Sequence, residues 1–194
     1  MRVLVIFAHP DLDSLNGQLF RASIENIEKN GHSVDKIDLY RDNFNPVLSL
    51  QERRSYFDAS NRAPEVHRYA EKLAQAEALI LCFPTWCLGP PAILKGFFDR
   101  VMKPGVSFKI DSVGELYPNL KNIKRVVSIV TYGRSRPILY WFGDPPRRMM
   151  TRYIRWFISK SAKVSYYGLY NLHKPNLKKI KNFQHRVLSE IDRL

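Results

Sequence analysis

The sequence predicts an α/β fold in which a five-stranded parallel sheet lies between two layers of helices. Apolar or β-branched runs alternate along the chain with segments of helical periodicity, which indicates repeated strand–helix–strand units and a parallel sheet. The 194 residues suit one domain spanning residues 1–194, and 45% hydrophobic residues supply an ordinary core. Right-handed crossovers favour the strand order 2-1-3-4-5, a three-layer sandwich with helices on both faces.

The strands are expected where apolar and β-branched residues run together. The first run is continuous and ends at His9-Pro10, as in a strand covered on both faces by helices. The second run is more polar, which favours a place near the edge of the sheet. The five expected strands are residues 3–8, 33–39, 78–83, 125–130 and 163–169.

The helices are expected where apolar residues recur at spacings of three and four. The first helix stops at Asn30-Gly31, a left-handed end signal. Pro90-Pro91 opens the fourth helix, where the missing N–H of proline costs nothing. The expected helices are residues 16–29, 50–57 within a polar segment 41–63, 65–75, 90–101, 149–158 and 177–194, with a long excursion over residues 103–124.

Positive charge is concentrated in the C-terminal quarter of the chain. The chain carries 31 Lys and Arg against 18 Asp and Glu, and residues 147–194 hold 12 of the basic and 2 of the acidic residues. This excess favours a phosphate-bearing cofactor, an acidic partner or an anionic membrane surface; a solvated face without a partner is the alternative. Nucleic acid is a weaker expectation, because an amphipathic helix covering a sheet interleaves basic and aromatic residues in the same way.

The cysteines and the N-terminal residues indicate the cellular compartment of the protein. Cys82 and Cys87 are too few for a disulfide scaffold or a zinc site, and they fit a reducing compartment. The N-terminal apolar run is too short for a signal peptide, and no run reaches the roughly 20 residues that span a bilayer. We therefore expect a soluble, cytoplasmic protein without a metal site.

Three loops follow strands 1, 3 and 4, where this sheet order places its ligand crevice. The first holds His9 and Ser14 before a helix whose first N–H groups suit a phosphate; a simple N-cap at Ser14 is the alternative. In the second, Trp86 either stacks on a planar ring or packs into the core or a subunit interface. In the third, Gly133 and Arg134 suit a developing negative charge. No Gly-rich nucleotide motif occurs, which disfavours nucleotide hydrolysis and a Rossmann-type dinucleotide site.

The second loop and the following helix resemble the flavodoxin-like NAD(P)H:quinone oxidoreductases over a long and specific stretch. Residues 83–101 read FPTWCLGPPAILKGFFDRV, where the family reads F-P-[LM]-x-[WF]-x-x-[VL]-P-A-I-L-K-G-[WF]-[FI]-[DE]-R-V. Ala8-His9-Pro10 with Ser14 and Asn16 is similar to the family's A-H-[PS]-x-x-x-S-x-N loop, and Phe44-Asn45-Pro46 matches its F-[ND]-P element. The resemblance covers residues 1–135.

The resemblance implies a flavodoxin-like homodimer that binds FMN or FAD, accepts hydride from NAD(P)H and passes it to a quinone or similar small-molecule acceptor in two alternating steps. An alternative from the same relatives is a flavin-binding ancillary subunit, for example of a potassium-efflux system, with little turnover. The flavin-binding residues that the resemblance implies lie in all three loops: His9, Ser14, Leu15, Asn16; Pro84, Thr85, Trp86, Cys87, Leu88; Thr131, Tyr132, Gly133 and Arg134.

The third loop and the segment after it depart from the family pattern. The family usually reads T-T-G-G there, so the bulkier Tyr132 and Arg134 are expected to narrow the pocket or to change which acceptor fits. Tyr140 lies near the position of a family tyrosine that assists hydride transfer, and it is the expected catalytic residue. Phe142 stands where the histidine partner of that tyrosine would be.

Overall fold

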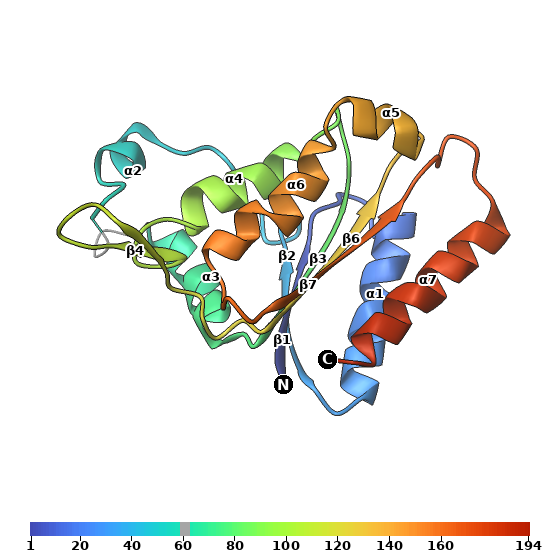
Figure 1. Cartoon of the computed structure of the whole chain (residues 1–194), viewed down its shortest axis with the longest axis horizontal. Coiled ribbons are helices and arrows are strands. Elements are labelled where there is room, and N and C mark those ends of the chain that lie inside the picture. Colours follow the sequence, from blue (N-terminus) through green and yellow to red (C-terminus); the bar gives the residue numbers. More distant parts are fainter. Residues whose placement is uncertain (59–62) are drawn as a thin grey trace.

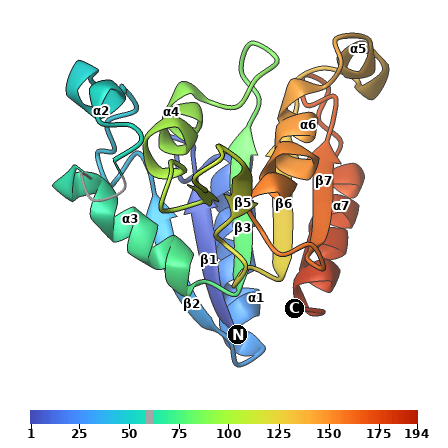
Figure 2. The same ribbon diagram turned by 60° about the vertical axis from the view of Figure 1, so that its left-hand side comes forward.

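A single parallel sheet organises the computed structural model, which describes residues 1–58 and 63–194. Its strand order is β2-β1-β3-β6-β7, which is the expected 2-1-3-4-5 when the sheet strands are counted along the chain. Helices α3, α4 and α6 cover one face of the sheet, and α1 and α7 cover the other (Figures 1 and 2). The strands are β1 (Arg2–Phe7), β2 (Ser33–Asp38), β3 (Ala78–Pro84), β6 (Arg125–Thr131) and β7 (Lys163–Leu169).

The buried strands alternate their side chains between the two layers of the core. In β1, Val3, Val5 and Phe7 pack with α1 and α7, whereas Leu4 and Ile6 pack with the helices of the opposite face. Because successive side chains of a strand point to opposite faces, a strand buried on both sides needs an unbroken apolar run. This requirement explains why the sequence located the strands so closely.

The helices agree with the expected pattern up to residue 101 and again from residue 177, but differ between residues 136 and 158. The expected helix 149–158 is wrong: α6 ends at Thr151 and a 3₁₀ turn, η1, follows, while the short helix α5 was not expected. Asp144 has a left-handed φ of 42°, and the prolines directly after it begin α6. The helices are α1 (Leu15–Lys29), α2 (Leu50–Arg54), α3 (Pro64–Gln75), α4 (Ala92–Val101), α5 (Arg136–Trp141), α6 (Pro145–Thr151), η1 (Tyr153–Trp156) and α7 (Leu177–Ile191).

The excursion over residues 103–124 contains a two-stranded antiparallel hairpin that stands apart from the main sheet. Its strands are β4 (Phe108–Ile110) and β5 (Leu116–Pro118). Within the expected polar segment 41–63, α2 begins at a capping box formed by Ser49 and Glu52. Residues 59–62 of that segment lie outside the described residues. Across the described part of the chain, no helix is long and apolar enough to cross a membrane.

Helix α4 is held against the segment after β2 by a close backbone approach. A Cβ placed on Gly96 would lie 2.3 Å from the carbonyl oxygen of Pro46 and 2.4 Å from its Cβ. The absence of a side chain at Gly96 therefore lets α4 pack directly on the loop that contains Phe44, itself buried in the core.

We predict that Gly96→Ala destabilises the protein by about 2 kcal/mol, because the new methyl group overpacks the contact with Pro46. Alanine has the higher helix propensity, so without this contact the same substitution would stabilise by about 1 kcal/mol. Urea unfolding measures the sign of the change in the free energy of unfolding. Gly133→Ala is the control, because a Cβ there meets nothing within 4 Å; equal effects of the two substitutions would contradict the prediction.

Candidate functional site

The carboxyl ends of β1, β3 and β6 are tied to one another by side chains and backbone of the loops that follow them. The side-chain amide of Asn16 donates to Thr131 Oγ1 over 3.0 Å, and Thr85 donates to Thr131 O from its backbone N over 2.9 Å and from its Oγ1 over 3.1 Å. The rings of His9 and Trp86 lie 5.8 Å apart. We call these five residues the strand-end junction; it shows that the three loops converge.

In the first loop, the Ser14 hydroxyl makes its hydrogen bonds within the protein. Its hydroxyl accepts from Gly17 N over 3.1 Å and donates to Asp11 O over 2.6 Å, so the N-cap role weighed above is confirmed. The loop also closes tightly on the helix, since a Cβ on Gly17 would lie 1.9 Å from Leu12 O. His9 Nδ1 lies 3.0 Å from Asp11 N and 2.9 Å from Asp11 O, so this nitrogen is engaged within the loop and Nε2 is left to meet another group.

Asn16 is the most informative residue of the first loop. It is 3% exposed, its amide nitrogen is used by Thr131, and its Oδ1 has no hydrogen-bond partner within the described structure. A buried amide oxygen without a donor is costly, so it marks a place where a donor from another molecule is accommodated. The Leu15 side chain packs with the α1–α7 layer of the core, which leaves only its backbone for a ligand.

The second loop is a two-residue turn in a strained conformation. Trp86 and Gly89 exchange both backbone hydrogen bonds, at 3.0 and 2.9 Å, around Cys87 and Leu88, whose φ values are 49° and 62°. Such a turn has type I′ character and normally contains Asn or Gly. Each left-handed non-glycine residue costs about 1–2 kcal/mol, and strain of this kind accumulates at functional sites.

The side chains of this loop differ in their surroundings. Trp86 is 43% exposed, so it is not a core residue, and its ring offers an open face beside His9. Cys87 is exposed and Leu88 packs against the core, while Pro84 is buried as the last residue of β3. The other cysteine, Cys82, is a small core residue, and burial raises the pKa of its thiol.

The expectation that Tyr132 narrows the pocket is wrong. Its ring is 1% exposed and stacks on Tyr170, with ring centroids 4.5 Å apart. Its hydroxyl donates to Asp144 over 2.7 Å and contacts the hydroxyl of Tyr166. Burial, and then the charge and hydrogen bond of Tyr166, raise the pKa of Tyr132 far above its ordinary value, so the phenol remains a protonated donor. Tyr132 therefore anchors the third loop from inside the protein.

The rest of the third loop is exposed and is supported by the loop after β7. The carbonyls of Gly133 and Arg134 accept from His173 Nδ1 over 2.6 Å and from Asn171 N over 2.9 Å. Sequence reasoning missed His173 and the tyrosines around Tyr132, because it considered only three strand-end loops. The signal was available, since the end of β7 lies at the same edge of the sheet.

Tyr140 is not part of the strand-end junction. It lies on α5 with its side chain 84% exposed, so the fold does not hold its hydroxyl toward the three loops. The role expected for Tyr140 in hydride transfer therefore gains no support from the geometry. In the described residues, no group of His, Cys, Asp and Glu side chains could hold a metal ion.

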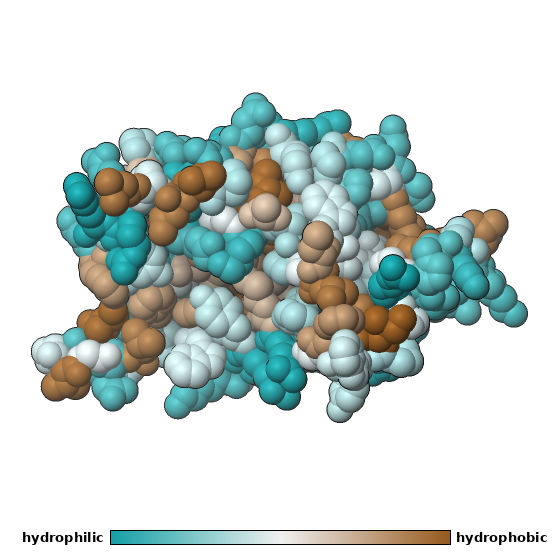
Figure 3. Space-filling model, turned by 90° about the horizontal axis from the view of Figure 1, so that it is seen from above, coloured by the Kyte–Doolittle hydropathy of each residue, from teal (hydrophilic) through white to brown (hydrophobic). Residues whose placement is uncertain are grey.

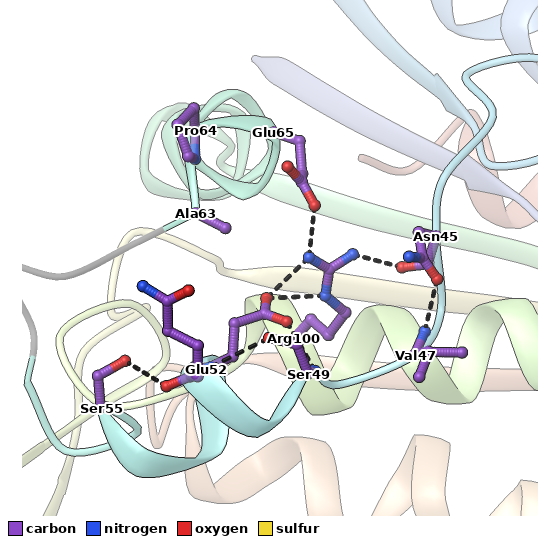
Figure 4. Close-up of a pocket in the computed structure, with 10 residues that line it drawn as sticks. Asn45, Val47, Ser49, Glu52, Ser55, Ala63, Pro64, Glu65 and Arg100 are labelled. Carbon is purple, nitrogen blue, oxygen red and sulfur yellow. Dashed lines mark hydrogen bonds and ion pairs between the residues drawn. The ribbon is translucent and has the colours of Figure 1, made fainter.

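Figure 3 looks down on the face that carries the strand ends, where hydrophobic groups gather at several separate places among hydrophilic ones. A cavity of about 270 Å³ lies elsewhere, between α2, α3 and α4, around the buried Arg100 (Figure 4). Arg100 donates to Glu52 over 2.8 Å, to Glu65 over 2.6 Å and to the carbonyl of Asn45. Two carboxylates already neutralise this guanidinium, so the cavity is an ion-pair site of the fold and does not offer a free cation.

Comparisons with known proteins agree with this architecture. Residues 1–159 match the model of a family described as having a flavodoxin-like fold. A Haemophilus influenzae protein named an uncharacterized NAD(P)H oxidoreductase is 39% identical over 138 residues, which cover 70% of this chain and 66% of that protein. Against other curated relatives, the chain spans about half of their length.

Two solved structures have the same fold over almost the whole chain. An NAD(P)H:quinone oxidoreductase from Methanothermobacter marburgensis superimposes with a TM-score of 0.84 at 24% identity, covering 99% of this chain and 98% of that one. An FMN-dependent NADH-azoreductase from Bacillus anthracis, in complex with FMN, gives 0.76 at 17% identity over 99% and 98% of the two chains. At these identities the likeness establishes the fold.

We predict that Arg100→Met costs about 3 kcal/mol of stability at neutral pH, because it leaves Glu52 and Glu65 without their cation. Lys95→Met, which breaks an exposed pair with Asp99, should cost less than about 1 kcal/mol. Burial alone would raise the pKa of Glu52, but hydrogen bonds from Arg100 and Ser49 and the charge of Arg100 outweigh it, so the pKa is lowered.

The stability lost in Arg100→Met should also depend on pH. A lowered pKa stabilises the folded state above the ordinary pKa of Glu52, and this contribution disappears as the pH falls through the folded value. The difference between the wild type and Arg100→Met should therefore shrink on acidification. Urea unfolding across that range measures it, and a difference independent of pH would show that Arg100 stabilises by packing alone.

Proposed function

The chain belongs to the flavodoxin-like fold family that residues 1–159 match, and from the strand-end junction we propose that it is a flavin-dependent NAD(P)H oxidoreductase whose acceptor is a quinone or similar small molecule. The observation that carries the proposal is the convergence of three loops on Thr131, with the orphaned amide oxygen of Asn16 between them. Relatives named as NAD(P)H oxidoreductases support the proposal.

The residues at the junction fit a flavin, either FMN or FAD. The first turn of α1 presents backbone N–H groups without helical partners, which suit the flavin phosphate, and His9 Nε2 takes no part in the contacts that Nδ1 makes within the loop. Asn16 Oδ1 accepts a hydroxyl donor such as the ribityl chain carries. Trp86 offers its exposed face to the ring system. When bound, the flavin supplies the hydride-accepting chemistry, and NAD(P)H and the acceptor react with it in turn.

The protein itself holds hydrogen-bond donors in place before the reaction begins. The type I′ turn holds the N–H groups of Cys87 and Leu88 outside the reciprocal bonds of Trp86 and Gly89, so they remain free to donate along the edge of a ring. Exposed Gly133 and Arg134 bring an N–H group and a guanidinium to the opposite side of the junction. Donors fixed where negative charge develops favour hydride uptake without reorganisation.

A flavin-binding ancillary subunit with little turnover is the second candidate. The observation in its favour is that the side chain of Tyr140 is exposed to solvent and that the five residues of the strand-end junction include a single side chain, His9, able to exchange a proton. A homodimer, which the family resemblance implies, and a cytoplasmic location, which the two cysteines favour, belong to the same proposal. So does a role for the basic residues 147–194 in contacting an acidic partner.

One preparation of the full-length protein tests the proposed function. We expect flavin absorbance in the purified protein, release of FMN or FAD on denaturation, and steady-state reduction of a soluble quinone by NADH or NADPH. Protein that is colourless and gains no thermal stability from added FMN or FAD would sink the proposal. Bound flavin without turnover would favour the ancillary role.

We predict that Trp86→Ala weakens flavin binding by about 1 kcal/mol, because a stacking contact is lost. A fluorescence titration of the apoprotein with FMN measures the change. Trp156→Ala is the control, since Trp156 is 66% exposed on η1, away from the junction. If both variants bind FMN like the wild type, Trp86 does not contact the ring.

A further inference from the structure

Helix α5 projects beyond the carboxyl ends of β6 and β7 (Figures 1 and 2). Four apolar side chains of α5 and its C-terminal cap are exposed. The exposed fractions are 44% for Ile138, 84% for Tyr140, 80% for Trp141 and 50% for Phe142, while Leu139 alone anchors the helix in the core. We call these four exposed residues the α5 knob. Contiguous exposed apolar groups of this kind mark interaction sites on a protein surface.

Arginines flank the α5 knob along the chain. Residues 134–155 contain six arginines and one carboxylate, Asp144, which accepts the hydrogen bond of buried Tyr132. The side chains of Arg134, Arg136 and Arg148 are exposed, and in the described part of the chain none of them belongs to an ion pair. Arg148 is placed at the far end of α5, since a Cβ on Gly143 would lie 3.5 Å from its guanidinium.

The knob is coupled directly to the proposed active site. Arg134 is the last residue of the third loop, and α5 begins two residues later, at Arg136. The carbonyls of Gly133 and Arg134 are fixed by His173 and Asn171. A surface bound by the α5 knob would therefore lie beside the strand-end junction.

We propose that the α5 knob docks the protein on an anionic membrane surface. Tryptophan and tyrosine prefer the boundary between headgroups and acyl chains, because each joins a large apolar ring to a polar group. Arginines next to them pair with lipid phosphates and are attracted by anionic lipids. A second copy meeting the same face would set arginine against arginine.

Docking specifies the acceptor of the proposed reaction. If the chain is the oxidoreductase argued above, which this step assumes, a docked molecule holds its junction next to the lipid phase, so the acceptor is a lipid-soluble quinone. The docking itself needs no flavin. The two proposals can therefore fail separately.

The test is cosedimentation of the full-length protein with vesicles of phosphatidylcholine alone and of phosphatidylcholine mixed with phosphatidylglycerol. We expect binding to the mixed vesicles that weakens as salt is added. Trp141→Ser should reduce that binding on the order of tenfold and Arg136→Gln about fivefold. Trp156→Ser is the matched control, with the same residue type exposed elsewhere, and should bind like the wild type.

Two results would overturn the docking. One is equal or absent binding of the wild type to both kinds of vesicle. The other is a wild-type dimer in sedimentation velocity that Trp141→Ser converts to monomers, which would assign the knob to a contact between copies. Vesicle binding by a protein that never binds FMN or FAD would leave the docking intact and remove the proposed function instead. Reduction of a soluble quinone by a protein that does not bind vesicles would support the proposed function and overturn the docking.

Discussion

The hydrogen bonds to Thr131 hold together the loops that form the proposed active site. Parallel strands bring their carboxyl ends to one edge of the sheet, but they do not by themselves join the loops beyond it. Here one threonine at the end of β6 accepts from Asn16 through its side chain and from Thr85 through its carbonyl. Loops separated by dozens of residues in the chain are thereby held in one arrangement before any ligand arrives.

Most buried polar side chains in the described part of the chain have partners within the protein, and three buried atoms do not: Asn16 Oδ1, Ser128 Oγ and the hydroxyl oxygen of Tyr170. Arg100 is enclosed by Glu52, Glu65 and a carbonyl, and Tyr132 is enclosed by Asp144 and two tyrosines. Each is satisfied within the protein, as buried polar groups must be. Asn16 keeps a free oxygen, and it does so at the edge of the sheet where the other loops meet. The contrast separates structural polar groups from one suited to a ligand.

The sheet could be predicted from the sequence because strands buried on both faces consist of unbroken apolar runs, as in β1 and β3. The prediction failed between residues 136 and 158, where α5 and α6 are short and a left-handed Asp144 separates them. The structure brings the motif residues His9, Asn16 and Trp86 together at the junction. The burial of Tyr132 was missed because its partners come from just before α6 and from β7 and the residue after it, and such distant contacts have no local signature.

The turn at Cys87 has a practical consequence for studying the protein. The chain has two cysteines, and Cys82 is buried in the core with a raised pKa, which makes it unreactive. The exposed thiol of Cys87 sits at the apex of the second loop, one residue from Trp86. A maleimide-linked fluorophore would thus attach at a single position without mutagenesis, giving an optical reporter at the mouth of the crevice.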